Sequence, residues 1–401
     1  MLTFLFHDKK VSGAWGNAPT SRYCLDLTNE VCKDNSLLLI TDIDGYWKGH
    51  TPFHIHFFIP ENKKYTTVST TINAEYNPAD RSFWEGRKSN PDMGNQYWHQ
   101  QIELVNLNQL TSAALQPIDV ALLGYVCDEG VRRNRGRIGA HEGPKAIRER
   151  LAKQPIHFDT KRVVDAGDIV CSDDDMESCQ QLFARSVTQL LQQRVFPIAL
   201  GGGHDMSYGH FLGIWDAIKD TPKRRVAIIN FDAHFDLRPV EGRPNSGTPF
   251  NQVLTQFAAQ GVTVDYFAIG IQQQSNTREL FQIARQRNIG YAINYDCESA
   301  SVEMEALKAR LRSIVERNDY LYVTIDMDGF SSAYAPGVSA PSPLGFTPYF
   351  VFKLLSYLLS TQKVIAFDIA ELNPSFDRDK HTATLAAKIV DFVVMNHRPA
   401  L

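Results

Sequence analysis

Residues 225–236 read Arg225-Val-Ala-Ile-Ile-Asn-Phe-Asp232-Ala-His234-Phe-Asp236, an apolar run that leads directly into three possible metal ligands. In an extended backbone, residues at positions i, i+2 and i+4 point to one side. One short segment can therefore aim two carboxylates and an imidazole at a single point. The polar side of a half-buried strand usually carries residues such as Thr, Lys or Ser, so this triplet indicates a ligand site.

Two other apolar runs end in the same way. Tyr320–Ile325, rich in β-branched and aromatic residues, is followed by Asp326-Met-Asp328, and Phe196–Leu200 is followed by Gly-Gly-Gly-His204-Asp205. Open α/β sheets bind their ligands at the carboxyl ends of strands. The three predicted strand ends therefore supply six candidate metal ligands: His204, Asp232, His234, Asp236, Asp326 and Asp328.

The composition of the chain is that of a globular protein. Its 401 residues can form one large α/β domain or two smaller ones, and its net charge of −4 gives no sign of a nucleic-acid partner. No apolar stretch approaches the roughly 20 residues that span a bilayer, and the apolar start is too short for a signal peptide. The six cysteines are scattered without a CxxC pair, which favours a reduced, cytoplasmic compartment.

From about residue 119 onward, apolar runs alternate with amphipathic stretches. This alternation predicts an α/β fold with a mostly parallel central sheet and helices on both faces. The expected strands are Asp119–Val126, Arg162–Asp165, Phe196–Leu200, Arg225–Phe231, Val264–Ile269, Tyr320–Ile325 and Val364–Ile369. The expected helices include Met176–Gln193, Arg278–Arg287, Val302–Glu316, Pro348–Ser360 and Thr382–Val394.

The first 74 residues do not follow this alternation. Ser36–Ile40 and His54–Ile59 have the pattern of strands, but no helical stretch lies between them. We therefore expect an N-terminal extension of unknown role over residues 1–74 and a catalytic domain over residues 75–401.

The candidate ligands favour two metal ions over one. Aspartate and histidine suit Mn²⁺, Fe²⁺, Co²⁺ or Zn²⁺, and the lack of thiolates argues against a structural zinc site. Four carboxylates and two imidazoles are too many for one catalytic zinc, but they fit two ions about 3.5–4 Å apart that activate a bridging water for hydrolysis. Alone, Asp326 and Asp328 are equally compatible with a solvated turn. Asp205 is expected to cap the helix that follows it.

The three motifs, taken in this order, resemble those of the ureohydrolase (arginase/agmatinase) superfamily over roughly residues 75–401. The resemblance implies a three-layer α/β sandwich and a binuclear centre with two Mn²⁺ per subunit. It also implies that His204 and Asp236 bind one ion, that His234 and Asp328 bind the other, and that Asp232 and Asp326 bridge both.

Departures from the arginase pattern resemble the formimidoylglutamase subfamily. The last motif continues as Asp326-Met-Asp-Gly-Phe-Ser-Ser, where arginases and agmatinases have a further Asp-Pro. In the loop Arg243-Pro-Asn-Ser-Gly-Thr-Pro-Phe250, Ser246 replaces a histidine of those enzymes. The segment Gly124–Pro144, which contains Asp-Glu-Gly-Val-Arg-Arg-Asn, matches the same subfamily.

This resemblance implies the hydrolysis of N-formimidoyl-L-glutamate to L-glutamate and formamide, in histidine degradation. A metal-bridging hydroxide would attack the formimidoyl carbon. Glu371 is at the position where the superfamily places a glutamate that binds the cationic nitrogen group. Asp328, in addition to binding metal, would pass a proton to the leaving nitrogen.

The two carboxylates of such a small-molecule substrate require cationic or polar partners. Arg238 follows Asp236 by two residues, and an arginine there would bind a carboxylate with two hydrogen bonds. In the basic loop at residues 132–137, Arg133 and Asn134 are predicted to contact the substrate. Ser246, in the place of the missing histidine, completes the predicted substrate-binding set.

Two alternatives remain open. The first is another guanidine or amidine hydrolase, such as agmatinase or guanidinobutyrase, although the cationic substrate of agmatinase would not need Arg238 and the basic loop. The second is a metal-binding relative without activity, which the complete set of ligands and Glu371 disfavours. Members of the superfamily often form homo-oligomers, but no feature of this sequence decides the oligomeric state.

Overall fold

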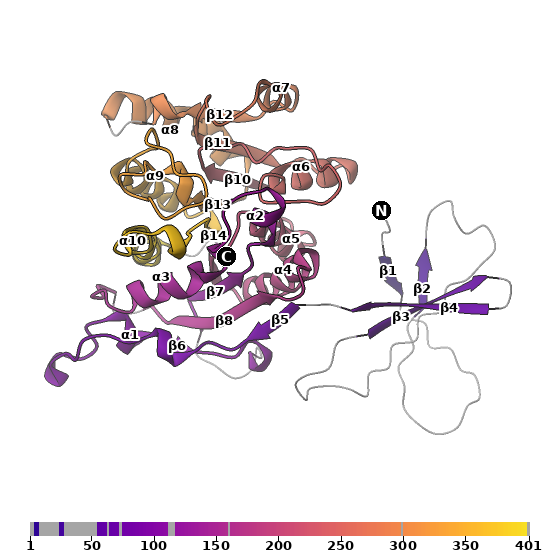
Figure 1. Cartoon of the computed structure of the whole chain (residues 1–401), viewed down its shortest axis with the longest axis horizontal. Helices are drawn as coiled ribbons and strands as arrows, with labels where there is room; N and C mark the ends of the chain where they lie inside the picture. Colours follow the sequence, from indigo (N-terminus) through magenta and orange to yellow (C-terminus); the bar gives the residue numbers. More distant parts are fainter. Residues whose placement is uncertain are drawn as a thin grey trace. The chain divides into compact units, whose positions relative to one another are not determined.

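A computed structural model of the chain describes residues 4–7, 24–27, 54–61, 64–71, 74–110, 117–158, 161–297 and 300–398 (Figure 1). The chain divides into two compact units, Met1–Asn73 and Ala74–Leu401, and this division lies one residue from the boundary expected from the sequence.

In the N-terminal unit, the described residues form two antiparallel strand pairs. Strand β1 (Phe4–His7) pairs with β2 (Cys24–Leu27), and β3 (His54–Glu61) pairs with β4 (Lys64–Thr71). The strand predicted over His54–Ile59 is confirmed as part of β3. The strand predicted over Ser36–Ile40 lies outside the described residues.

The second unit is built on a ten-stranded sheet in the order β12-β11-β10-β13-β14-β9-β7-β8-β5, with β6 paired to β8 off this path. All its pairs are parallel except that of β5 with β8. The strands are β5 (Ala74–Asn77), β6 (Glu103–Leu104), β7 (Val120–Val126), β8 (Val163–Cys171), β9 (Phe196–Leu200), β10 (Val226–Phe231), β11 (Asp265–Ile271), β12 (Gly290–Ile293), β13 (Tyr320–Asp326) and β14 (Val364–Ala370).

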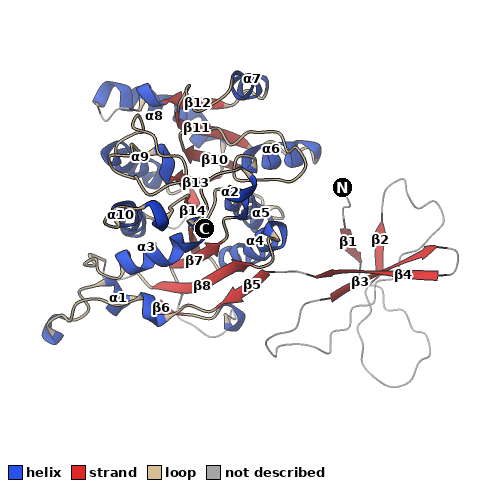
Figure 2. Cartoon of the chain, viewed as in Figure 1, coloured by secondary structure: helices blue, strands red, loops and turns tan. Residues whose placement is uncertain are grey.

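Helices cover both faces of this sheet, which confirms the predicted fold class (Figure 2). Apolar residues of α3, α8, α9 and α10 form the core on one face, and those of α4, α5, α6 and α7 form the core on the other. The helices are α1 (Trp98–Gln101), α2 (Glu129–Arg133), α3 (Gly143–Leu151), α4 (Met176–Gln192), α5 (Met206–Ile218), α6 (Pro249–Ala259), α7 (Arg278–Gln286), α8 (Ser301–Arg317), α9 (Pro348–Ser360) and α10 (His381–Asn396).

Strand β10 shows why its sequence is almost entirely apolar. Ala227, Ile229 and Phe231 pack into one core, whereas Val226 and Ile228 pack into the other. Both sides of the strand are therefore buried, as expected for a central parallel strand between two helical layers. The polar residues that follow it are held at the carboxyl edge of the sheet.

Strand β8 is longer than the sequence pattern indicated. We expected it to end at Asp165, but it continues to Cys171. The polar residues Asp165 and Asp168 interrupt the apolar pattern, and both accept hydrogen bonds from the buried Arg148, at 2.8 and 2.6 Å. A buried charge is tolerated where it is paired. The partner, Arg148, is 17 and 20 residues away in the sequence, so no local pattern indicates it. The short strands β5, β6 and β12 were also not predicted.

A buried histidine near the end of α10 gives the fold a predicted pH dependence. His397 stacks on Phe196 with ring centroids 3.7 Å apart, and its Nε2 lies 3.2 Å from the Val364 carbonyl oxygen. Burial lowers the pKa of His397 to about 4. Because the unfolded chain protonates this ring at about pH 6.5, stability is lost as the pH falls from that value towards the folded pKa.

The free energy of unfolding should therefore fall by about 2 kcal/mol between pH 7 and pH 5 because of this histidine. We expect His397→Phe, which keeps the stacked ring, to show no such fall. Urea unfolding of both proteins at the two pH values measures this difference. An equal loss of stability in both proteins would contradict a neutral, buried His397.

Within the described residues, no helix combines the length and the apolar character that crossing a membrane requires.

Candidate metal centre

The six predicted ligands follow strands that lie close together in the sheet. Strands β10 and β13 are adjacent, and β14 separates β13 from β9. Since these strands are parallel, their carboxyl ends lie at one edge of the sheet. That edge receives His204 after β9, the Asp232–Asp236 segment after β10, Asp326 and Asp328 at the end of β13, and Glu371 after β14.

The structure brings the six side chains into two groups that share Asp232. Within each group, the ligand atoms all lie within 4.8 Å of one another. The first group is His204, Asp232, Asp236 and Asp326, and the second is Asp232, His234 and Asp328. This matches the division between two ions that the resemblance implies, except that Asp326 belongs to the first group alone.

His204 is oriented as a ligand. Its Nε2 lies 2.9 Å from Thr324 Oγ1, which fixes one ring nitrogen. Its Nδ1 is buried without a hydrogen-bond partner and lies 3.0 Å from Asp236 Oδ2 and 3.1 Å from Asp326 Oδ2. A hydrogen bond to the other ring nitrogen sets the tautomer of a metal-binding histidine. The orphaned Nδ1 among carboxylates therefore fits a metal ion.

The carboxylates are held by local hydrogen bonds. The backbone N–H of His234 donates to Asp232 Oδ1 at 2.7 Å, and that of Asp328 donates to Asp326 Oδ1 at 2.8 Å. Asn230 Nδ2 donates to Asp232 Oδ2 at 3.1 Å. Each ligand pair is thus aimed by its own strand end, which explains the spacing of two residues in both motifs.

The charges of the cluster suit a bound cation. Burial, followed by repulsion from Asp328 and Asp232, raises the pKa of Asp326 well above its ordinary value. Burial and repulsion from Asp232 raise the pKa of Asp236 to about 6. Neighbouring buried carboxylates cannot all ionise without compensation. Oxygen and imidazole donors arranged in this way fit hard-to-borderline divalent ions such as Mn²⁺.

Two residues of the centre adopt a left-handed backbone. Asp236 has φ of 48° and Glu371 has φ of 64°. This conformation is unfavourable for residues other than glycine and tends to persist at functional sites, where the surroundings hold it in place. At Glu371, the backbone N–H donates to the Gly202 carbonyl, and Oε1 accepts the N–H of His204 at 2.9 Å. The turns that present His204 and Glu371 therefore hold each other.

A pocket of about 320 Å³ opens beside this cluster. Three residues predicted to bind substrate line it as one hydrogen-bonded chain. Arg238 donates to Asn134 Oδ1 at 2.7 Å, and Asn134 Nδ2 donates to Ser246 Oγ at 3.1 Å. Arg135, Glu371 and five of the six metal ligands also line the pocket, which therefore carries both cationic and anionic side chains.

Arg133 does not line this pocket. Its guanidinium donates to Glu129 at 2.7 Å and to both oxygens of Glu177, at 2.8 and 2.9 Å. These contacts join α2 to α4, so Arg133 has a structural role. They do not support the substrate contact that was expected from the sequence. Arg135, two residues later, faces the pocket instead. The signal that could have separated them is the i, i+4 spacing of Glu129 and Arg133, which is typical of an ion pair along a helix.

The expected cap at Asp205 is wrong in its hydrogen bond. Asp205 occupies the position before α5, but its side chain makes no bond to the helix N-terminus. Instead, Asp205 Oδ2 accepts the hydroxyl of Tyr125 at 2.7 Å. The buried hydroxyl on the neighbouring strand β7 binds this carboxylate in place of the helix N–H groups. No local sequence rule would indicate this partner.

Asn276 was missed by sequence reasoning. It lines the pocket, and its side chain accepts the Phe235 N–H at 3.0 Å and donates to the Ala233 carbonyl at 2.8 Å. It therefore holds the loop that carries His234 and Asp236. The sequence offers no signal for it, since the contact spans 41 residues or more.

Comparison with known proteins gives a consistent family. The arginase family matches residues 118–395. A formimidoylglutamase of Clostridium tetani is 39% identical over 330 residues, which covers 80% of this chain and 96% of the relative. One of Geobacillus thermodenitrificans is 40% identical over 316 residues, covering 78% of this chain and 94% of the relative.

Solved structures share the fold. Formimidoylglutamase from Bacillus subtilis superposes with a TM-score of 0.63 at 22% identity, over 73% of this chain and 91% of that one. Formiminoglutamase from Trypanosoma cruzi, solved with Mn²⁺, superposes with a TM-score of 0.62 at 26% identity, over 73% of this chain and 98% of that one.

Proposed function

Because the chain belongs to the arginase family, we propose that it hydrolyses N-formimidoyl-L-glutamate to L-glutamate and formamide. The observation that carries this proposal is the similarity to curated formimidoylglutamases, which extends over about four fifths of the chain at 39–40% identity. The protein is a hydrolase that acts on an amidine C–N bond.

The cofactor is a pair of Mn²⁺ ions in each subunit. His204 and Asp236 would hold one, His234 and Asp328 the other, and Asp232 and Asp326 would contribute to both. When bound, the ions supply water activated for hydrolysis near neutral pH.

Glu371 is proposed to orient the formimidoyl group. It lines the pocket, and burial raises the pKa of its carboxyl to about 8. A cationic amidine beside it favours the ionised form, which accepts charge-assisted hydrogen bonds from the =NH₂⁺ group. Asp328, which lines the same pocket, is proposed to pass a proton to the leaving nitrogen.

The glutamate end of the substrate is proposed to bind Arg238, with Asn134 and Ser246 holding this arginine in position. The carboxylates would replace part of the solvent around the exposed Arg238, whose guanidinium has one hydrogen bond to Asn134 Oδ1. Arg135, which also lines the pocket, is a second candidate for the other carboxylate. Three arginines line the pocket, Arg135, Arg137 and Arg238, which suits a dianionic tail better than a cationic one.

Replacing Glu371 by Gln is expected to lower kcat/KM by about 10- to 150-fold. A hydrogen bond to a charged group contributes about 1.5–3 kcal/mol, and the amide loses the charge while keeping the shape. Steady-state kinetics on the Mn²⁺-loaded variant measure the effect, with bound Mn²⁺ determined in parallel. A matched control is Glu142→Gln, at an exposed position outside the pocket. Unchanged kcat/KM with full metal content would remove Glu371 from the reaction.

The function is tested by incubating Mn²⁺-loaded protein with N-formimidoyl-L-glutamate, agmatine, arginine and 4-guanidinobutyrate. Glutamate and formamide released from the first compound alone would support the proposal. Urea from a guanidine compound would replace it with an arginase- or agmatinase-like activity. Metal uptake without turnover of any compound would indicate a relative without activity.

A cytoplasmic location and a homo-oligomeric state remain part of this proposal. No disulfide joins the cysteines that the structure describes, which suits a reducing compartment. Gel filtration with light scattering would measure the oligomeric state directly.

A further inference from the structure

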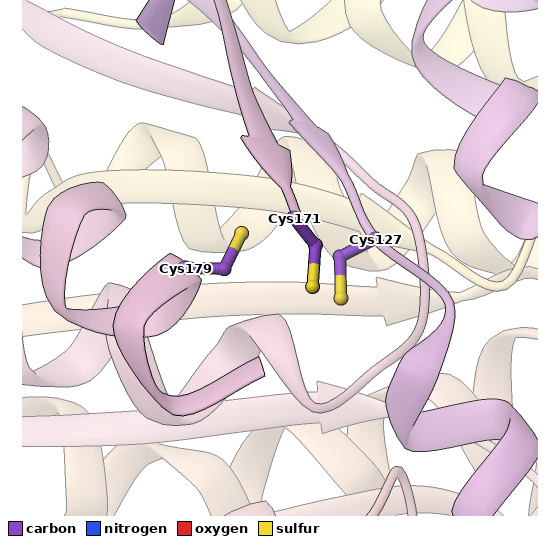
Figure 3. Close-up of side chains that lie close together, drawn as sticks. All are labelled: Cys127, Cys171 and Cys179. Carbon is purple, nitrogen blue, oxygen red and sulfur yellow. The ribbon is translucent and has the colours of Figure 1, made fainter. Parts of the chain in front are cut away.

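Three cysteines gather at the carboxyl ends of two other strands of the sheet. Cys127 follows β7, Cys171 ends β8 and Cys179 lies in α4. Their sulfur atoms all lie within 4.8 Å of one another. Figure 3 shows Cys127 and Cys171 side by side, with Cys179 reaching towards them from the helix.

The fold places these side chains together for a definite reason. Strands β7 and β8 are parallel neighbours, and their ladder ends with Val126 opposite Val170. The next residue on each strand is a cysteine, so both thiols leave the ladder at the same level. Helix α4 follows β8 after a short connection and returns Cys179 over the two strand ends.

The environment of the cluster favours a thiolate. Cys127 and Cys179 are buried, at 2% and 0% exposure, whereas Cys171 is half-buried. Hydrogen bonding from the thiols of Cys127 and Cys179 lowers the pKa of Cys171 to about 5. The thiolate is the form of cysteine that binds metal, and a half-buried member leaves a route for an ion to enter.

We propose that Cys127, Cys171 and Cys179 form a binding site for one thiophilic ion, Cu⁺ or Zn²⁺, separate from the Mn²⁺ centre. Soft thiolates select these ions, whereas the Asp and His centre suits harder ones. With metal–sulfur bonds of about 2.3 Å, three sulfurs around one ion lie about 3.8–4.0 Å apart. The three sulfurs therefore need to move by less than about 1 Å to bind the ion, and up to three thiol protons are released as they do so.

The number of ligands separates the two candidate ions. Structural zinc sites have four protein ligands, and the cluster of described residues supplies three. Zn²⁺ would therefore need a water as its fourth ligand, whereas Cu⁺ is satisfied by three soft ligands. The site is separate from the Mn²⁺ centre, since none of its members lines the pocket beside the Asp and His ligands.

The test uses full-length protein already saturated with Mn²⁺ and reduced with a phosphine. It is titrated with Cu⁺ held by a competing chelator and, in a separate arm, with Zn²⁺. Bound ions are counted by elemental analysis after desalting, and thiolate-to-metal charge transfer is followed by ultraviolet absorption. We expect one additional ion per chain, with full Mn²⁺ content retained, and the arm that saturates identifies the ion.

Cysteine variants decide where the additional ion binds. Cys171→Ala, at the half-buried position, and Cys179→Ala are each expected to weaken its binding at least 10-fold and to abolish the charge-transfer band. Cys297→Ala removes a buried cysteine from another part of the unit and should leave both unchanged. No additional ion in the unaltered protein, or equal binding in Cys171→Ala and the unaltered protein, would overturn the proposal. Folding of each variant is checked through its Mn²⁺ content and circular dichroism.

Discussion

Asp232→Ala is expected to lower kcat/KM by about 10³-fold or more and to reduce the Mn²⁺ content of the protein. Asp232 is the one residue shared by both ligand groups, and it accepts hydrogen bonds from the His234 backbone and from Asn230. Metal ions contribute several kcal/mol of charge stabilisation in such reactions, and each 1.36 kcal/mol is a factor of ten in rate.

Elemental analysis and steady-state kinetics on the same preparation measure this result. Asp220→Ala changes an exposed aspartate two residues after α5; it is the matched control and should behave as the unaltered protein. If Asp232→Ala retained two Mn²⁺ ions and full activity, the centre would have to be assigned to other residues.

Arg238→Ala is expected to lower kcat/KM for N-formimidoyl-L-glutamate by about 10- to 150-fold, mainly through KM. This range corresponds to the loss of a charged hydrogen bond of about 1.5–3 kcal/mol. Arg238 lies in the pocket and also donates to Asn134, so its removal leaves a carboxylate unpaired and loosens the chain that reaches Ser246.

A formimidoyl amine without carboxylates separates binding from chemistry. If Arg238 binds the substrate tail, its removal should leave turnover of this compound nearly unchanged. Arg243→Ala, in the same loop but bonded to Glu177 outside the pocket, should have little effect on either compound. An equal loss of activity on both compounds would show that Arg238 acts on the metal centre or the loop instead.

The metal ligands could be predicted because their geometry is local. Each ligand lies at a strand end or a few residues after it, and the parallel sheet brings these ends together. The extended backbone expected over Asp232–Asp236 is wrong, because β10 ends at Phe231 and Asp236 has φ of 48°. The sequence did not predict the roles of three other residues, Arg133, Asp205 and Asn276, because these roles depend on partners from other elements. Arg133 pairs with Glu177 of α4, Asp205 with Tyr125 of β7, and Asn276 with the backbone of a loop more than 40 residues earlier.

The strands, too, could be predicted where the pattern that defines them is local. Strands with both faces buried, such as β10, give continuous apolar runs that can be found in the sequence. Strand β8 was predicted too short because Asp165 and Asp168 have the pattern of loop residues. Only the structure shows that Arg148 donates a hydrogen bond to each of them. The edge strand β12 is four residues long and begins with glycine, so its sequence contains too little pattern to be recognised.

The order of the strands in the sheet has a consequence for how the protein is made. Strand β14, residues 364–370, lies between β13 and β9 and so separates the ligands that these two strands carry. During translation, His204 and Asp326 emerge long before the strand that sets their spacing. A ribosome-bound chain that stops short of β14 therefore holds every ligand but no complete centre. Manganese binding at this centre therefore depends on β14 being in place between β13 and β9.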